Sequence, residues 1–82
     1  MVASIIPFPL ARRTAFIQRH AARMAALCPA SAETYLALQI RIQAQAMQRR
    51  GVAAEIIVHE QEAMQRAVLS TLHRIEVAER AP

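Results

Sequence analysis

The chain contains no lysine, asparagine, aspartate or tryptophan, and its 82 residues include one glycine and one cysteine. Without Asn or Asp, and with a single Gly, it lacks the residues that tight β-hairpin turns require. Its three aromatic side chains, Phe8, Phe16 and Tyr35, leave the core to Ala, Leu, Ile, Val and Met. The lone Cys28 excludes an internal disulfide and a multi-cysteine metal site, and we expect it to be buried and inert. These absences favour an all-α protein.

The sequence also lacks long apolar runs, and this absence bears on the cellular compartment of the protein. No stretch of eighteen apolar residues is present to span a membrane. A single cysteine suits a reducing compartment, so we expect a cytoplasmic protein. A secretory signal carries positive charge before its apolar stretch, whereas the apolar residues 4–10 precede Arg12 and Arg13. A mitochondrial leader stays an alternative, because the first acidic residue is Glu33.

Hydrophobic residues make up 55% of the chain, which argues against disorder, and their spacing predicts three helices. Residues 1–8 are expected to be extended, because Ile6 and Phe8 each precede a proline. The first helix is predicted over 9–27, with Pro9 at its first position, where the missing N–H costs nothing. Its apolar positions recur at helical spacing: Leu10, Ile17, Met24 and Leu27.

The second helix is predicted over 31–50, with Ser31 as its N-cap and Gly51 just beyond its end. Pro29 is expected to end the helix that precedes it. The second helix is apolar over a wide arc, which predicts neighbours on two sides. One of its stripes contains Tyr35, Leu38, Ile42 and Ala46, and the other contains Leu36, Ile40 and Met47.

The third helix is predicted over 53–79 and forms an antiparallel hairpin with the second through the turn at Gly51. At 1.5 Å per residue it is about 40 Å long and overhangs the second helix, which is about 28 Å long. We therefore expect an extended arm and three helices, in a small bundle that dimerisation completes. The expected buried stripe of the third helix contains Ile57, Met64, Val68, Leu72 and Ile75.

The arm at the front of the chain carries Ile5, Ile6 and Phe8. These residues are expected to pack over the helical hairpin, and packing across a dimer satisfies them equally. Burying Phe8 contributes roughly 1.5–3 kcal/mol, which is a sizeable share of the stability of a small domain. A third role for the arm is docking on a partner protein.

The sequence contains no catalytic constellation. His59 and Glu60 begin the H-E-x-x-H zinc motif, but Ala63 stands where the second His is needed. Ser70 and His73 lie one helical turn apart, yet no side chain is placed to orient the imidazole. A Gly-rich phosphate loop is absent as well. We therefore expect a protein that is not an enzyme and that has no metal and no cofactor.

Arginines gather on the first predicted helix. Arg12, Arg19 and Arg23 lie within about 40° of one another around the helix axis. Phe16 lies on the same line and Arg13 beside it, and we call these five residues the Arg face. Four interpretations stay open: contact with an acidic protein, contact with nucleic-acid phosphates, contact with a membrane surface, or a solvated face paired with Glu residues of the third helix.

The distribution of charge adds to this pattern. Residues 1–50 hold seven Arg and one Glu, whereas residues 51–82 hold three Arg and five Glu. Arg suits carboxylates and phosphates because its planar guanidinium binds them in a bidentate manner, although high-GC coding also favours Arg over Lys. We expect an interaction or regulatory module that presents the Arg face to an acidic protein partner. The alternative is a nucleic-acid-binding protein that contacts phosphates without reading sequence.

Two short motifs carry a family resemblance: I-I-P-F-P-x-x-R-R at residues 5–13 and R-R-G-V at residues 49–52. Together with the Arg-rich helix between them, they resemble a family of short bacterial proteins that carries a domain-of-unknown-function label. Its members are found mainly in alphaproteobacteria. The opening I-P-F-P-x-x-R-R is the most specific part. The resemblance implies a bacterial, cytoplasmic setting and assigns no mechanism.

Overall fold

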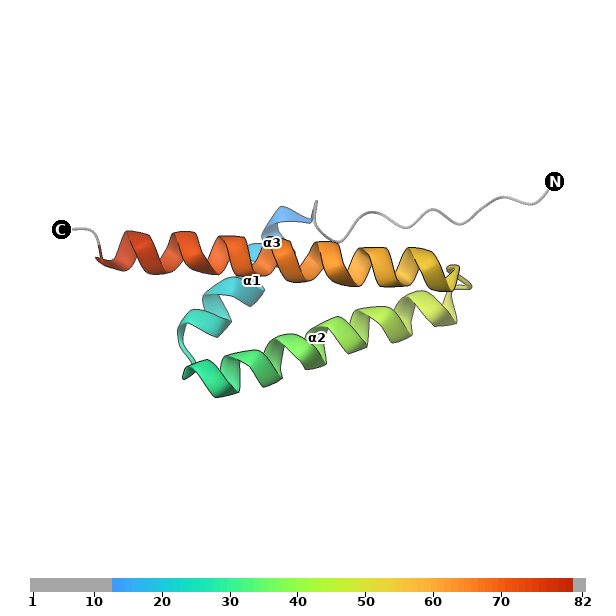
Figure 1. Ribbon diagram of the computed structural model, residues 1–82, viewed down its shortest axis with the longest axis horizontal. Helices are drawn as coiled ribbons and strands as arrows, with labels where there is room; N and C mark the ends of the chain where they lie inside the picture. The colour runs from blue at the N-terminus through green and yellow to red at the C-terminus, as the bar shows by residue number, and fades with distance from the viewer. Residues whose placement is uncertain (1–12, 81–82) are drawn as a thin grey trace.

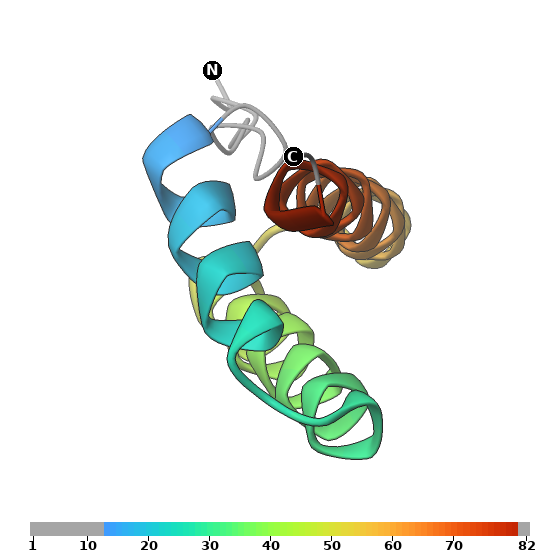
Figure 2. The same ribbon diagram turned by 90° about the vertical axis from the view of Figure 1, so that its left-hand side faces the viewer.

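The computed structural model describes residues 13–80, which fold into three helices and no strand (Figure 1). Helix α1 spans Thr14–Ala25, α2 spans Pro29–Arg49 and α3 spans Ala54–Arg80. Helices α2 and α3 form an antiparallel hairpin, and α1 packs against both of them from one side (Figure 2). The predicted all-α class and the helical hairpin are therefore confirmed. The arm residues Ile5, Ile6 and Phe8, like Arg12 and Leu10, lie outside the described residues.

Helix α1 is shorter than the sequence predicts. Arg13 has a non-helical backbone, with φ −81° and ψ 78°, and the helix ends at Ala25 rather than near residue 27. The early end has a steric cause, because a residue that precedes proline avoids the helical region. Cys28 accordingly adopts an extended backbone, with ψ 157°. The chain must leave the helix before reaching it.

Pro29 is the first residue of α2, whereas the sequence predicted only that it would end the helix before it. It occupies the first turn of α2, with Cys28 as the N-cap residue, so the predicted N-cap at Ser31 is wrong. A proline at the first helical position sacrifices no hydrogen bond, because its N–H would have had no intrahelical partner. The Ala32 N–H then closes the first turn on the Cys28 carbonyl at 2.9 Å.

The turn between α2 and α3 is a Schellman motif centred on Gly51. The Gly51 N–H donates to the Gln48 carbonyl at 3.0 Å, and the Val52 N–H donates to the Met47 carbonyl at 3.1 Å. These are the two bonds that define the motif. Gly51 has φ 81°, a left-handed conformation that glycine adopts without steric cost. Val52 and Met47 are both buried, which supplies the apolar contact that accompanies such ends.

Gly51→Ala is expected to lower the free energy of unfolding by about 1–2 kcal/mol, because a Cβ at this position clashes in the left-handed region. Urea denaturation followed by helical circular dichroism measures the change. An unchanged midpoint at an unchanged slope would show that the turn relaxes to another conformation.

The core lies along the line where the three helices meet. Its buried stripes agree with the prediction for α3 and for the second stripe of α2, and Leu72 and Ile75 pack partly buried at its edge. The main contributors from the three helices are Ile17, Ala21, Met24, Leu36, Met47, Ile57, Met64 and Val68. The first predicted stripe of α2 is only partly covered. Leu38 and Ile42 are 48% and 41% exposed.

Candidate interaction surface

A chain of ring contacts joins α1 to α2. The Arg19 guanidinium carbon lies 5.9 Å from the centroid of the Phe16 ring. Phe16 meets His20 edge to face, with 4.4 Å between ring centroids and 74° between ring planes. A hydrogen bond of 2.6 Å joins His20 Nδ1 to the hydroxyl of Tyr35 on α2. The contacts fix the relative position of two aromatic side chains and one cation at the α1–α2 junction.

His20 is the central residue of this chain, and it is buried, with 7% of its surface exposed. It lies on the side of α1 that faces α2, where its ring is hydrogen-bonded to Tyr35. Burial of the ring lowers the pKa of His20 below its usual value, and the nearby positive charge of Arg19 lowers it further. Both effects favour the neutral form of the imidazole.

The structure reduces the Arg face to a smaller set of exposed residues. Arg19 and Arg23 are exposed, one helical turn apart on α1. Phe16 is half-buried and packs against the core, so only part of its ring is available to a partner. Arg13 is half-buried, and Arg12 lies outside the described residues.

Helix α2 adds an apolar portion that the sequence pattern assigned to the core. Tyr35 is half-buried at the junction, and Leu38 and Ile42 follow it at one-turn and two-turn spacing along the same helix. Leu38 and Ile42 are among the most exposed large apolar side chains of the described residues. We call the combined region the α1–α2 surface. It consists of Phe16, Arg19, Arg23, Tyr35, Leu38 and Ile42.

The α1–α2 surface lacks negative charge. Helix α1 contains no acidic residue and α2 contains only Glu33, which lines a hollow between α2 and α3 instead. Neither Arg19 nor Arg23 forms an ion pair with a carboxylate among residues 13–80. Within these residues, the interpretation that Glu side chains of the third helix pair with these two arginines is therefore wrong. Their charges are available to a carboxylate from outside.

Cys28 is exposed, so the expectation that it is buried is wrong. It ends the loop between α1 and α2, and its Sγ lies 3.2 Å from Ser31 Oγ. Hydrogen bonding with Ser31 lowers the pKa of the Cys28 thiol, because a hydroxyl donor stabilises the thiolate. Across residues 13–80, no three His, Cys, Asp or Glu side chains are grouped as metal ligands would be.

None of the three described helices combines the length and the apolar character that crossing a bilayer requires.

Comparison with known proteins places the whole chain in one family. No curated protein and no solved structure matches it. The resemblance to proteins without an assigned activity is confirmed at this level, while the bacterial setting stays a prediction. A family model matches residues 1–82, and the chain belongs to the family of unknown function DUF6074.

Proposed function

We propose that the protein is a non-enzymatic interaction module, which binds an acidic, amphipathic segment of another protein through the α1–α2 surface. One observation carries this proposal. Arg19 and Arg23 have no carboxylate partner among the described residues. The ring contacts from Arg19 through Phe16 and His20 lead to Tyr35 of α2, and the exposed Leu38 and Ile42 follow Tyr35 at one-turn and two-turn spacing. A segment with Glu or Asp beside apolar side chains satisfies both kinds of group.

The arginines supply orientation and the apolar residues supply affinity. Guanidinium groups bind carboxylates through paired, charge-assisted hydrogen bonds. Arg19 is partly preorganised for such a contact, because its guanidinium lies near the face of the Phe16 ring. Burial of Leu38 and Ile42 by a partner removes apolar area from water at about 25 cal/mol per Å². Exposed apolar side chains that are rimmed by polar ones are typical of protein-binding surfaces.

A nucleic-acid partner is less well supported by this geometry. Binding to phosphates requires an array of cations, and the α1–α2 surface contains two exposed arginines and two exposed aliphatic side chains. Single-stranded nucleic acid stacks its bases on exposed aromatic rings, whereas Phe16 packs against the core and against His20. We therefore treat nucleic-acid binding as an outcome of the test.

The test compares two labelled probes by fluorescence anisotropy: a helical peptide with Glu on one side and Leu on the other, and a random-sequence DNA duplex. The proteins are the wild type, the double variant Arg19→Gln/Arg23→Gln, and the control Arg66→Gln/Arg80→Gln. The control removes the same charge from exposed positions of α3. Titrations at roughly 50 and 200 mM salt separate phosphate contacts, which weaken steeply with salt.

The wild type and the control are expected to bind the peptide, with the double variant about tenfold weaker, since two charge-assisted contacts are lost. Peptide affinity that is equal in all three proteins would refute the role of Arg19 and Arg23. Duplex binding that falls with salt and disappears only in the double variant would replace the proposal with the nucleic-acid alternative.

A further inference from the structure

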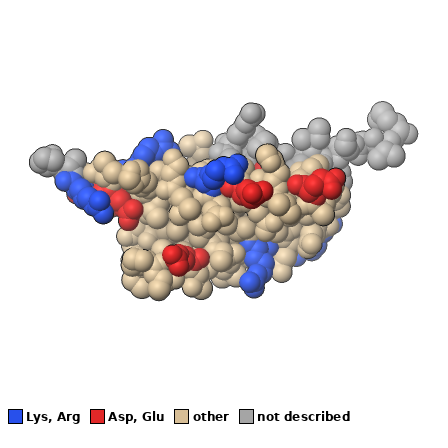
Figure 3. Space-filling model, in the orientation of Figure 1, with Lys and Arg blue, Asp and Glu red and all other residues tan. Residues whose placement is uncertain are grey.

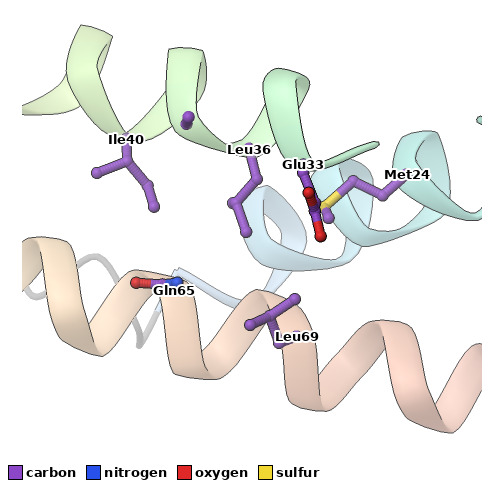
Figure 4. Close-up of a pocket in the computed structure, with 7 residues that line it drawn as sticks. Met24, Glu33, Leu36, Ile40, Gln65 and Leu69 are labelled. Carbon is purple, nitrogen blue, oxygen red and sulfur yellow. The ribbon is translucent and has the colours of Figure 1, made fainter. Parts of the chain in front are cut away.

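A second surface of the protein, on the hairpin of α2 and α3, is hollowed along its length. One hollow of about 530 Å³ is lined by Leu36 and Ile40 of α2, Leu69 of α3 and Met24 of α1. Leu36 and Ile40 point from α2 toward α3, and Met24 reaches from α1 toward Glu33 (Figure 4). Nearer the Gly51 turn, α2 and α3 enclose another hollow of about 370 Å³. Together these hollows form a groove along the hairpin.

Both sides of the groove contribute apolar side chains. On the α2 side, the small Ala37 and Ala44 line the hollows at seven-residue spacing, and the longer Arg41 lies between them. On the α3 side, Leu69 and Val58 line them and stay 44% and 53% exposed. Small side chains such as Ala37 and Ala44 leave room for larger ones such as Leu69 and Val58 to pack on them.

The two edges of the groove carry opposite charges at about the same distance along the hairpin from the Gly51 turn. Arg41 on α2 lines the hollow that Gln61 of α3 also lines, and Glu62 follows Gln61 on the outward side of α3. Both Arg41 and Glu62 are exposed, and neither forms an ion pair within residues 13–80. On the face of the molecule where α2 and α3 lie side by side, charges of both signs are scattered among larger neutral areas (Figure 3).

We propose that this groove is the interface of a symmetric dimer, in which a second copy of the chain closes it. A two-fold axis parallel to the helices places α2 of one copy against α3 of the other. Residues at one level of the hairpin then face one another across the axis. Arg41 of each copy meets Glu62 of its partner, so the pairing occurs twice, as a two-fold interface requires.

The same arrangement satisfies the apolar side chains. It brings Leu69 against Ala37 of the second copy and Val58 against Ala44, so that two large side chains of each copy pack on two small ones of the other. The four helices form a bundle with antiparallel neighbours, which is a stable arrangement for amphipathic hairpins. The interface is separate from the α1–α2 surface, and its existence does not depend on the proposed function.

Charge reversal tests the interface with a self-complementary design. Sedimentation equilibrium is measured for the wild type, for Arg41→Glu, for Glu62→Arg and for an equimolar mixture of the two variants. Each variant alone places like charges opposite each other twice. The mixture restores two opposite-charge pairs in the heterodimer. Arg23→Glu changes the charge by the same amount on the α1–α2 surface and serves as the control.

The wild type and Arg23→Glu are expected to dimerise, each single reversal to weaken dimerisation about tenfold or more, and the mixture to recover it. Circular dichroism confirms that each variant stays helical. A wild type that is monomeric at high micromolar concentration would overturn the proposal. So would a dimer that neither reversal weakens, or a mixture that dimerises no better than its components.

Discussion

Met64→Ala is expected to lower the free energy of unfolding by about 2–5 kcal/mol, which is the range for truncating a fully buried methionine. Met64 has 0% exposure and lies at the centre of α3 among core residues from all three helices. Truncation leaves a cavity that the surrounding helices fill only in part. Small domains have total stabilities near the lower end of about 5–15 kcal/mol, so the variant is expected to be largely unfolded at physiological temperature.

Thermal and urea denaturation measure the effect, and Met64→Leu is the matched control. Leucine nearly conserves the side-chain volume, so that variant is expected to lose less than about 1.5 kcal/mol. Equal losses in Met64→Ala and Met64→Leu would show that the site responds to any change of shape. Loss in neither variant would contradict the placement of Met64 in the core.

Acidification is expected to destabilise the fold through His20. The pKa of His20 is lowered in the folded state by burial and by the charge of Arg19, so the unfolded chain binds the proton more tightly. Stability therefore rises with pH where His20 titrates. The contribution of neutral His20 is fully present above its ordinary pKa of 6.5, and it is lost as the pH falls below that value toward the lowered folded pKa.

Urea denaturation at a series of pH values between about 4.5 and 8 covers this window. His20→Gln is expected to flatten the dependence over the part of the range just below pH 6.5, because the buried group no longer gains a charge. The exposed His73 provides the control, and His73→Gln is expected to keep the wild-type dependence. If the free energy of unfolding depends on pH in the same way in all three proteins, the pH dependence comes from groups other than His20.

The hairpin was predictable because its signals are local and agree with one another. Helical spacing fixed the buried side of α3, and the single glycine of the chain fixed the turn. Gly51 both permits the left-handed backbone and ends α2 with the Schellman bonds. Predicted and observed bounds of α3 differ by one residue at each end.

The bounds of α1 and the start of α2 were not predictable by the same reasoning. Pro29 ends one helix and begins the next, and a local rule gives it either role. In the structure, Cys28 has an extended backbone between the two helices. The first helix therefore ends before its predicted last residues, and Pro29 is the first residue of α2.

Only part of the α1–α2 surface could be predicted from the sequence. Arg19 and Arg23 are visible as one side of a helix, but Leu38 and Ile42 look like core positions when α2 is considered alone. In the structure, Leu38 and Ile42 are exposed. The burial of His20 was missed because its partner Tyr35 lies 15 residues away on another helix.

The most direct test of the proposed function is a map of amide chemical shifts in the ¹⁵N-labelled full chain during titration with the acidic amphipathic peptide. The account predicts that the largest changes fall on the α1–α2 surface, at Arg19, Arg23, Leu38 and Ile42, and that the α2–α3 groove near Leu69 changes little. Changes centred on the groove, or none at a peptide excess, would contradict the claim that this surface binds an acidic partner.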